Sequence, residues 1–256
     1  MNEYFVLSGF VVGVLVGFTG VGGGSLMTAL LISVFGVHPV AAVGTDLLFA
    51  AATKSVGTRV HAGKGNVVWR VVSLLALGSI PGTLVVIFVL AQLPVHDPAV
   101  TRWLRHAISV ALLISGASLL LGSRALPTEP GDEVRSSAFT APLTVLLGFV
   151  LGVLVSLTSV GAGAIGMVAL CYLYPRASSV RLVGSDIAHA VPLTLLAGSG
   201  HWLIGDIDWP MLFALLTGSV PGIIIGSHFA HRVAERYLRM ILGVGLLAIG
   251  ASLIVK

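Results

Sequence analysis

Thr19-Gly20-Val21-Gly22-Gly23-Gly24 stands in the middle of an apolar run that extends from Tyr4 to Phe35. A matching run, Pro142–Tyr174, is interrupted by Thr158-Ser159-Val160-Gly161-Ala162-Gly163. Each run is too long for one helical crossing of a bilayer, which takes about 20 residues, and glycine clusters weaken helices and allow turns. Each run is therefore either a broken helix that crosses once or a hairpin of two half-helices that enters and leaves on one side.

The chain also repeats itself at a constant offset of 140 residues. The matched pairs are Val43-Gly44-Thr45-Asp46 with Val183-Gly184-Ser185-Asp186, His61 with His201, Trp69 with Trp209, and Gly78-Ser79-Ile80-Pro81-Gly82 with Gly218-Ser219-Val220-Pro221-Gly222. The two glycine-rich breaks match one residue out of that register. A duplicated, very hydrophobic chain with glycine breaks at corresponding places is typical of secondary transporters.

Composition places this chain in a bilayer. Hydrophobic residues make up 56% of the sequence and charged residues only 9%, against about 25% charged residues in soluble domains. The long continuous apolar runs also differ from the alternating pattern of an outer-membrane barrel. We therefore expect an all-α integral membrane protein, and the net charge of +4 does not indicate nucleic-acid binding. Cys171, the only cysteine, excludes an internal disulfide.

Positive charge distinguishes the two interpretations of the broken runs, because Lys and Arg accumulate in cytoplasmic loops. Six other runs are long enough to cross: His38–Thr58, Val67–Leu90, Trp103–Leu121, Ser178–Leu196, Trp209–Ala230 and Tyr237–Val255. If the broken runs also cross, the 14 Lys and Arg residues divide seven to seven. If they are re-entrant, Arg102, Arg105 and Lys256 share one face and the other eleven share the opposite face.

The re-entrant interpretation is preferred, because it alone gives a usable charge bias. It predicts two inverted repeats of three crossings each, residues 1–122 and 138–256, in one integrated membrane domain. A polar linker, 123–137, would join them in the cytoplasm. Both termini would lie outside the cell (inner or plasma) membrane.

The two breaks predict a binding site for a small anion. The amide groups at the start of a helix have no intrahelical partner, the helix dipole adds positive charge there, and glycine allows close approach. Two inverted hairpins would point two such helix starts, near Ser25 and Ala164, at one central point near the midplane. The alternative is that the glycines only allow close helix packing. The candidate substrate-binding residues are Thr19, Gly20, Gly22, Gly23, Gly24, Ser25, Thr158, Ser159, Gly161 and Gly163. Neither break contains Arg or Lys, which suggests recognition by dipoles and hydroxyls.

The sequence resembles the sulfite exporter family of TauE/SafE type along essentially its whole length. The resemblance rests on Gly17–Gly24, Val43–Asp46 with Lys54-Ser55, and Gly65-Asn66-Val67-Val68-Trp69-Arg70 in the first half. In the second half it rests on Val183–Asp186, His201-Trp202 and Gly205-Asp206-Ile207-Asp208-Trp209. The resemblance implies transport of sulfite, sulfonates or other small sulfur-containing or organic anions, without fixing the substrate. Many members carry a hydroxyl residue where this chain has Asp46 and Asp186.

Four ionisable residues are expected within the membrane, where such groups usually face a partner or a cavity. Asp46 and Lys54 fall near one helix face, while Asp186 and His189 stand at i and i+3, within mutual hydrogen-bonding reach. Asp46, Lys54, Asp186 and His189 are thus candidates for proton coupling or gating. The carboxylates could equally be structural acceptors for free amides of the hairpins, or Asp186 a partner of Lys54 in an ion pair.

Two further pairs of matched residues are of interest. Pro81 and Pro221 lie inside spans and are candidate hinges, or fixed bends. His61 and His201 stand at corresponding helix ends, where an interfacial capping role is expected.

A secondary transporter that works by alternating access, with protons as a further partner, is the function that these features predict. We expect no cofactor, no bound metal and no enzymatic activity, and a small anion and the lipid bilayer as partners. The alternatives are a passive anion channel and, with little support, an intramembrane hydrolase. A hydrolase needs a nucleophile oriented by a base, and Ser159 has no Gly-x-Ser-x-Gly elbow around it.

Overall fold

The computed structural model describes residues 2–19, 24–121, 139–204, 207–229 and 235–255. These residues form ten α-helices and no strand. The first half contains α1 (Asn2–Thr19), α2 (Gly24–Ser33), α3 (Pro39–Gly63), α4 (Trp69–Gln92) and α5 (Pro98–Leu121). The second half contains α6 (Thr140–Thr158), α7 (Ile165–Leu173), α8 (Ser179–Ile204), α9 (Trp209–Phe229) and α10 (Glu235–Val255). The expected polar linker, 123–137, lies outside the described residues.

Seven of the described helices are long and apolar enough to cross a membrane. They are α3, α4, α5, α6, α8, α9 and α10, and α1 is a shorter apolar helix of the same kind. The expected class, an all-α integral membrane protein, is confirmed. Leu77, Leu84 and Phe88 illustrate the outer surface of α4, because each is more than half exposed, as suits side chains that face lipid.

The second broken run has the expected helix–break–helix form, and the first has two helical arms with residues 20–23 between them outside the described residues; in both runs the arms differ in length. The first arms, α1 and α6, have 18 and 19 residues, or about 27 Å at 1.5 Å per residue. The second arms, α2 and α7, have 10 and 9 residues, or about 14 Å. The expectation of two half-helices is therefore wrong for the first arm, because the apolar stretch before each break is already nearly long enough to cross. It holds for the second arm, which begins at Gly24 and at Ile165.

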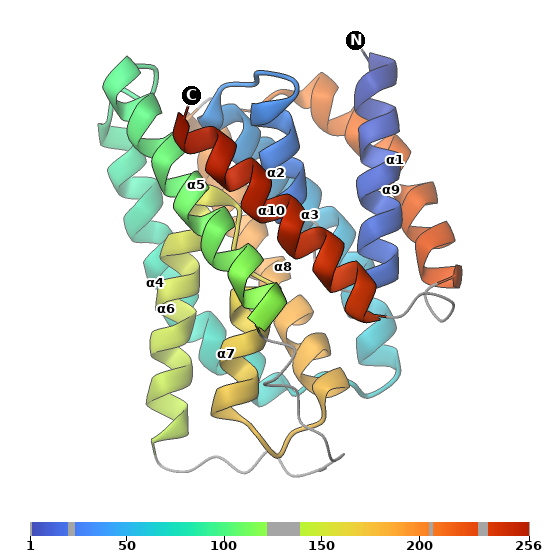
Figure 1. The fold of residues 1–256 in the computed structure, drawn as a ribbon. Helices are drawn as coiled ribbons and strands as arrows, with labels where there is room; N and C mark the ends of the chain where they lie inside the picture. Colours follow the sequence, from blue (N-terminus) through green and yellow to red (C-terminus); the bar gives the residue numbers. More distant parts are fainter. Residues whose placement is uncertain (1, 20–23, 122–138, 205–206, 230–234, 256) are drawn as a thin grey trace.

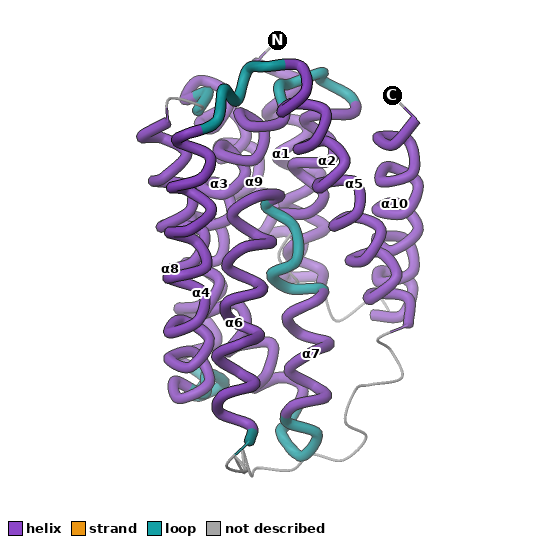
Figure 2. Tube along the Cα trace, turned by 90° about the vertical axis from the view of Figure 1, so that its left-hand side faces the viewer, coloured by secondary structure: helices purple, strands orange, loops and turns teal. Residues whose placement is uncertain are grey.

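The course of the chain explains how such unequal arms fit together. In Figure 1 both termini lie at the upper end of the molecule, which we call the terminal end. The loop between α2 and α3 returns to that same end, whereas the loop between α7 and α8 and that between α3 and α4 lie at the opposite end. Figure 2 shows the loop between α6 and α7 turning back at the end of α6 before α7 begins. Each broken run thus enters and leaves at one end.

Helices of one half pack on helices of the other through matched glycines. A Cβ added at Gly9 of α1 would lie 2.2 Å from the Leu215 carbonyl oxygen of α9, and one added at Gly148 of α6 would lie 2.2 Å from that of Leu75 in α4. Gly78 and Gly218 show the same reciprocal contact, since a Cβ added at either would lie 1.9 Å from a carbonyl oxygen of the facing helix, that of Val145 or of Val6. The α1–α9 and α6–α4 contacts therefore correspond residue by residue, and in both the backbones meet too closely for a side chain.

The helices α3 and α8 cross at the centre of the molecule and are the most buried of the seven candidate spans. Matched hydrogen bonds join each of them to the loop after the other, from Val68 N to Ser185 Oγ and from Asp208 N to Thr45 Oγ1. Both helices run through the interior, so polar side chains on them are held away from lipid. This is where the ionisable residues expected from the sequence lie.

Candidate functional site

The second break owes its shape to three residues with positive φ. Ser159 ends α6 in the left-handed conformation (φ 58°), and Gly161 and Gly163 follow with φ of 121° and 111°. Only glycine adopts the last two values without strain. The Thr158 hydroxyl donates to the Leu154 carbonyl (2.7 Å) and accepts from the Val160 amide (3.1 Å). The backbone thus turns out of α6 and reaches the start of α7 inside the protein.

Several amides at and just before the start of α7 have hydrogen-bond partners within the protein. The Gly161 carbonyl accepts from the amides of Ile165 (3.1 Å) and Gly166 (3.2 Å). The Gly163 amide donates to the carboxylate of Asp186 on α8. The amides of Gly163, Ile165 and Gly166 therefore already have partners within the protein.

The first break lies mostly outside the described residues, which include neither Gly20 nor Gly22 and Gly23. Thr19 ends α1, and Gly24 and Ser25 open α2, but the side chains of these three residues also fall outside what is described. One turn further on, Thr28 of α2 is fully buried and donates to the Asp46 carboxylate through both its hydroxyl and its amide. Asp46 thus joins α3 to α2, as Asp186 joins α8 to the second break.

Each buried carboxylate keeps one oxygen without a hydrogen-bond partner among the described residues. These atoms are Asp46 Oδ1 and Asp186 Oδ1, and the Ser159 hydroxyl of the second break lies within hydrogen-bonding reach of the Asp46 carboxylate. Gly166 leaves the room that Asp186 needs, since a Cβ there would lie 2.5 Å from Asp186 Oδ1. Buried polar atoms are nearly always satisfied, so these two carboxylate oxygens mark a place suited to protons, water or a polar ligand.

Lys54 brings a positive charge to this place. Its side chain is only 6% exposed, and its Nζ lies 3.5 Å from the Ala162 carbonyl oxygen in the second break. Its charge interacts with both Asp46 and Asp186. Although neither break contains Lys or Arg, α3 of the other half places a cation on one of them. A positive charge therefore adds to the dipoles and hydroxyls that the sequence predicted at the breaks.

His189 is fully buried, but its partner differs from the one expected. Its Nε2 lies 2.9 Å from the Ser79 hydroxyl of α4, and no hydrogen bond to Asp186 forms. The i, i+3 spacing placed the two side chains on one helix without fixing their directions. Ser79 belongs to the repeated Gly78–Gly82 motif, which was the signal in the sequence that could have pointed to it.

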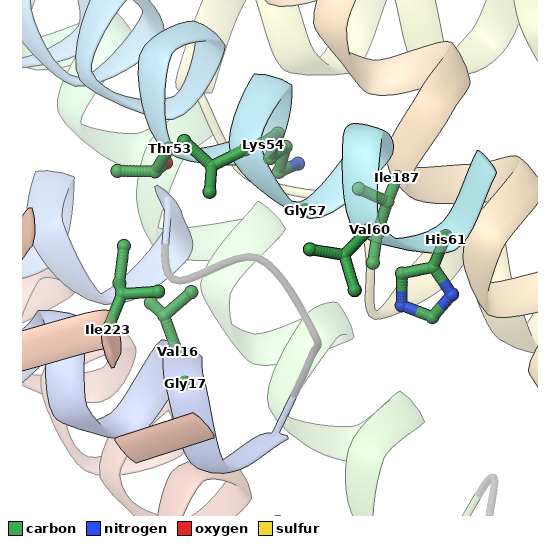
Figure 3. A pocket seen from close by; sticks show the side chains of 10 residues that line it. Val16, Gly17, Thr53, Lys54, Gly57, Val60, His61, Ile187 and Ile223 are labelled. Carbon is green, nitrogen blue, oxygen red and sulfur yellow. The ribbon is translucent and has the colours of Figure 1, made fainter. Parts of the chain in front are cut away.

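A cavity of about 230 Å³ opens beside Lys54, as Figure 3 shows. It lies between α1, α3, α8 and α9, along the C-terminal half of α3, and hence in the half of the molecule away from the terminal end. Its lining is Val16, Gly17, Thr53, Lys54, Val56, Gly57, Val60, His61, Ile187 and Ile223. It is smaller than the roughly 300–1,000 Å³ of sites for drug-sized ligands, so it suits a small solute.

The candidate hinges and the paired histidines occupy different surroundings. Pro81 and Pro221 lie inside α4 and α9, which continue through them as helices with both prolines exposed. His61 lines the cavity, whereas His201 is 1% exposed and its Nε2 lies 2.9 Å from the Ser156 carbonyl oxygen. His201 thus lies in the protein interior, with a carbonyl of the last turn of α6 as its partner.

The fold and this interior define a helical membrane transporter, with broken segments that carry buried polar groups between central helices. The chain belongs to the sulfite exporter TauE/SafE family, whose model matches residues 5–253. It is similar to the probable membrane transporter protein YjnA of Bacillus subtilis (strain 168), with 36% identity over 99% of this chain and 100% of the relative.

Two more distant relatives carry the same description. The probable membrane transporter protein YdhB of the same bacterium is 27% identical over 91% of this chain and 92% of its own length. A probable membrane transporter protein of Xylella fastidiosa (strain 9a5c) is 25% identical over 96% and 92%. No solved structure gives a significant match.

Proposed function

We propose that this protein is a secondary transporter of a small anion, such as sulfite, a sulfonate or another sulfur-containing or organic anion. The observation that carries the proposal is the position of Lys54, a buried ammonium that lines the cavity and reaches the second break. A charge at membrane depth is costly unless it is compensated, and a substrate anion would compensate Lys54 when a neighbouring carboxylate is protonated. The apolar remainder of the lining would accept the carbon atoms of an organic sulfonate.

The two carboxylates supply a basis for proton coupling. With Asp46 and Asp186 ionised, the neighbourhood of Lys54 carries a net negative charge that repels an anion. A proton on either carboxylate would leave the positive charge of Lys54 available to the substrate. Anion and proton would then bind and leave together. The substrate would meet Lys54 and the Ser159 hydroxyl, with the remaining residues of both breaks around it.

We further infer that residues 1–122 and 138–256 are inverted repeats within one membrane domain. The reciprocal glycine contacts of α1–α9 and α6–α4 support this relation. Arg59, Lys64, Arg70, Arg176 and Arg181 belong to helix ends and loops away from the terminal end. By the positive-inside rule that end would face the cytoplasm of the cell membrane, and both termini would lie outside.

Uptake by purified protein in proteoliposomes tests the role of Lys54, with radiolabelled sulfite, thiosulfate and sulfoacetate as substrates. We expect Lys54→Met to lower uptake at least about tenfold, because Met fills the space without the charge; a loss of ~1.4 kcal/mol of binding suffices for that factor. Lys64→Met is the matched control, since Lys64 is exposed at the end of α3, and should transport normally. Full uptake by monodisperse Lys54→Met protein would refute the assignment.

Counterflow in the same vesicles separates a carrier from a passive channel. Unlabelled substrate inside should accelerate the entry of labelled substrate through a carrier, because the loaded site returns faster than the empty one. A channel would show no such acceleration.

A further inference from the structure

The cavity has a counterpart in the other half of the protein, and that counterpart is filled. The repeat matches α3 and α4 with α8 and α9 at an offset of 140 residues, and α1 with α6 at 139. Applied to the ten cavity-lining residues, this relation gives ten positions nearer the terminal end. Nine of those ten are buried, and the tenth, Leu196, is partly buried. The two halves thus share a sequence pattern but differ in state.

Three matched positions show how the filled side is closed. Gly17, His61 and Ile223 line the cavity, and their counterparts are Ser156, His201 and Thr83, each no more than 1% exposed. The Ser156 carbonyl accepts from His201 Nε2 at 2.9 Å, and the Ser156 hydroxyl lies 3.0 Å from that of Thr83. Since a carbonyl only accepts, His201 carries its proton on Nε2. These bonds tie α8, α6 and α4 together.

The open side lacks the equivalent bonds. The His61 ring lies against Gly184 of α8, its Nδ1 has no partner among the described residues, and Gly17 stands across the cavity.

We propose that His61 and His201 are a pair of gating residues that close the two ends of the transport path in turn. In the present state His201 binds the Ser156 carbonyl and closes the terminal end. In the second state His201 releases Ser156, and His61 Nε2–H donates to the Gly17 carbonyl in α1. The cavity beside Lys54 then closes, and one lined by Thr194 and Ala197 opens toward the terminal end. This inference rests on the proposed transport function and specifies its two end states.

The two closed ends are unequal in one respect. Ser156 and Thr83 form a hydroxyl–hydroxyl bond, whereas their counterparts, Gly17 and Ile223, have no side-chain groups for one. A hydrogen bond of this kind, present in only one of the two states, shifts the equilibrium between them by roughly two- to tenfold. The state with a closed terminal end should therefore be the more populated one at rest, and Thr83→Val should reduce that preference by the same factor.

Thiol labelling measures the two states without any substrate. In a Cys171→Ser background, Gly57→Cys reports the present cavity and Ala197→Cys reports its counterpart; both replace small residues. A membrane-impermeant maleimide should label the Gly57→Cys variant from the face away from the termini. It should label the Ala197→Cys variant from the other face, several-fold more slowly. Ala111→Cys, at a fully buried position of α5, is the unreactive control.

Substitution of each histidine gives shifts of opposite sign. His201→Ala should speed labelling at position 197 and slow it at 57, because it removes the bond that closes the terminal end. His61→Ala should do the reverse, since it removes the bond of the second state. His201→Gln keeps an N–H donor and should lie between wild type and His201→Ala. If either alanine variant fails to give monodisperse protein, Thr83→Val and Ser156→Gly test the same closure and should both speed labelling at 197.

Shifts in the same direction for both histidine variants would overturn the proposal. So would an unreactive position 197 in wild type, His201→Ala and Thr83→Val while position 57 reacts. Labelling requires no transported solute, so failure of every anion in the uptake assay would leave this result intact and would count against the proposed function alone.

Discussion

Asp46 and Asp186 stand at matched positions of α3 and α8, and each is bound to the short helix or the break of its own half. Asp46 accepts from Thr28 in α2, and Asp186 accepts from Gly163 in the second break. Those contacts fit the structural role that the sequence allowed. Their second oxygens, without partners among the described residues, fit the proton-carrying role. The two roles are compatible, since one oxygen can anchor the break while the other takes a proton.

Replacement of either carboxylate by an amide separates these roles. Asn keeps an oxygen acceptor for the anchoring bond but carries no titratable proton. If anion and proton move together, wild-type uptake should rise when the outside of the vesicle is more acidic than the inside. We expect Asp46→Asn or Asp186→Asn to abolish that pH dependence and to leave anion exchange at fixed pH measurable. Uptake as a function of an imposed pH gradient is the measurement.

Thr28→Ser is the control for this experiment, because it keeps the hydroxyl that donates to Asp46 and should keep the pH response. A pH profile unchanged from wild type in both Asp→Asn variants would remove the coupling role. The carboxylates would then serve only to hold the breaks in place.

At the scale of helices, close backbone approaches add to the packing of the buried hydrophobic side chains. Small residues allow such approaches in membranes, and here they recur as Gly9 and Gly13 facing α9, and Gly148 and Gly152 facing α4. The same glycines could be mistaken for flexible points. Their positions in continuous helices, against carbonyl groups of the facing helix, show that they are packing residues.

Alanine substitutions at these contacts should destabilise the protein in proportion to the clash. Gly9→Ala and Gly148→Ala each place a Cβ 2.2 Å from a backbone oxygen, so each should cost about 1–3 kcal/mol. Gly245→Ala in α10 meets no atom within 4 Å and should be neutral or slightly stabilising. Thermal unfolding of the detergent-solubilised protein compares the three variants, and equal stabilities would contradict the packing role.

The helical elements were predictable from the sequence because their signals are local. The apolar runs, the glycine breaks and the starts of α2 and α7 near Ser25 and Ala164 follow from composition and spacing. The contact of Lys54 with the Ala162 carbonyl could not be predicted from the sequence, since it joins residues of different halves and depends on how α3 crosses α8. The different surroundings of His61 and His201 could not be predicted either, because matched sequences predict matched surroundings.

At the scale of the whole molecule, the orientation of the protein in the membrane is the remaining property to derive. The described structure brings the re-entrant runs back to the end from which they start, which is the geometry that gave the eleven-to-three charge distribution. That distribution predicts a cytoplasmic linker and external termini. The cavity beside Lys54 would then face the cytoplasm, so the present state would be inward-facing.

Single cysteines in a Cys171→Ser background test this orientation in the membrane. We expect Ser136→Cys, in the linker, to react with an impermeant maleimide only in inside-out vesicles. Gln92 is the last residue of α4 and is exposed at the terminal end of the molecule. Gln92→Cys should therefore react in intact cells. The two positions must label from opposite sides, because α5 alone separates the loop before it from the linker after it. If both positions react from the same side, α5 does not cross the membrane and the arrangement of the first half is wrong. If each position reacts from the side opposite to the one expected, the fold stands but the cavity faces the exterior.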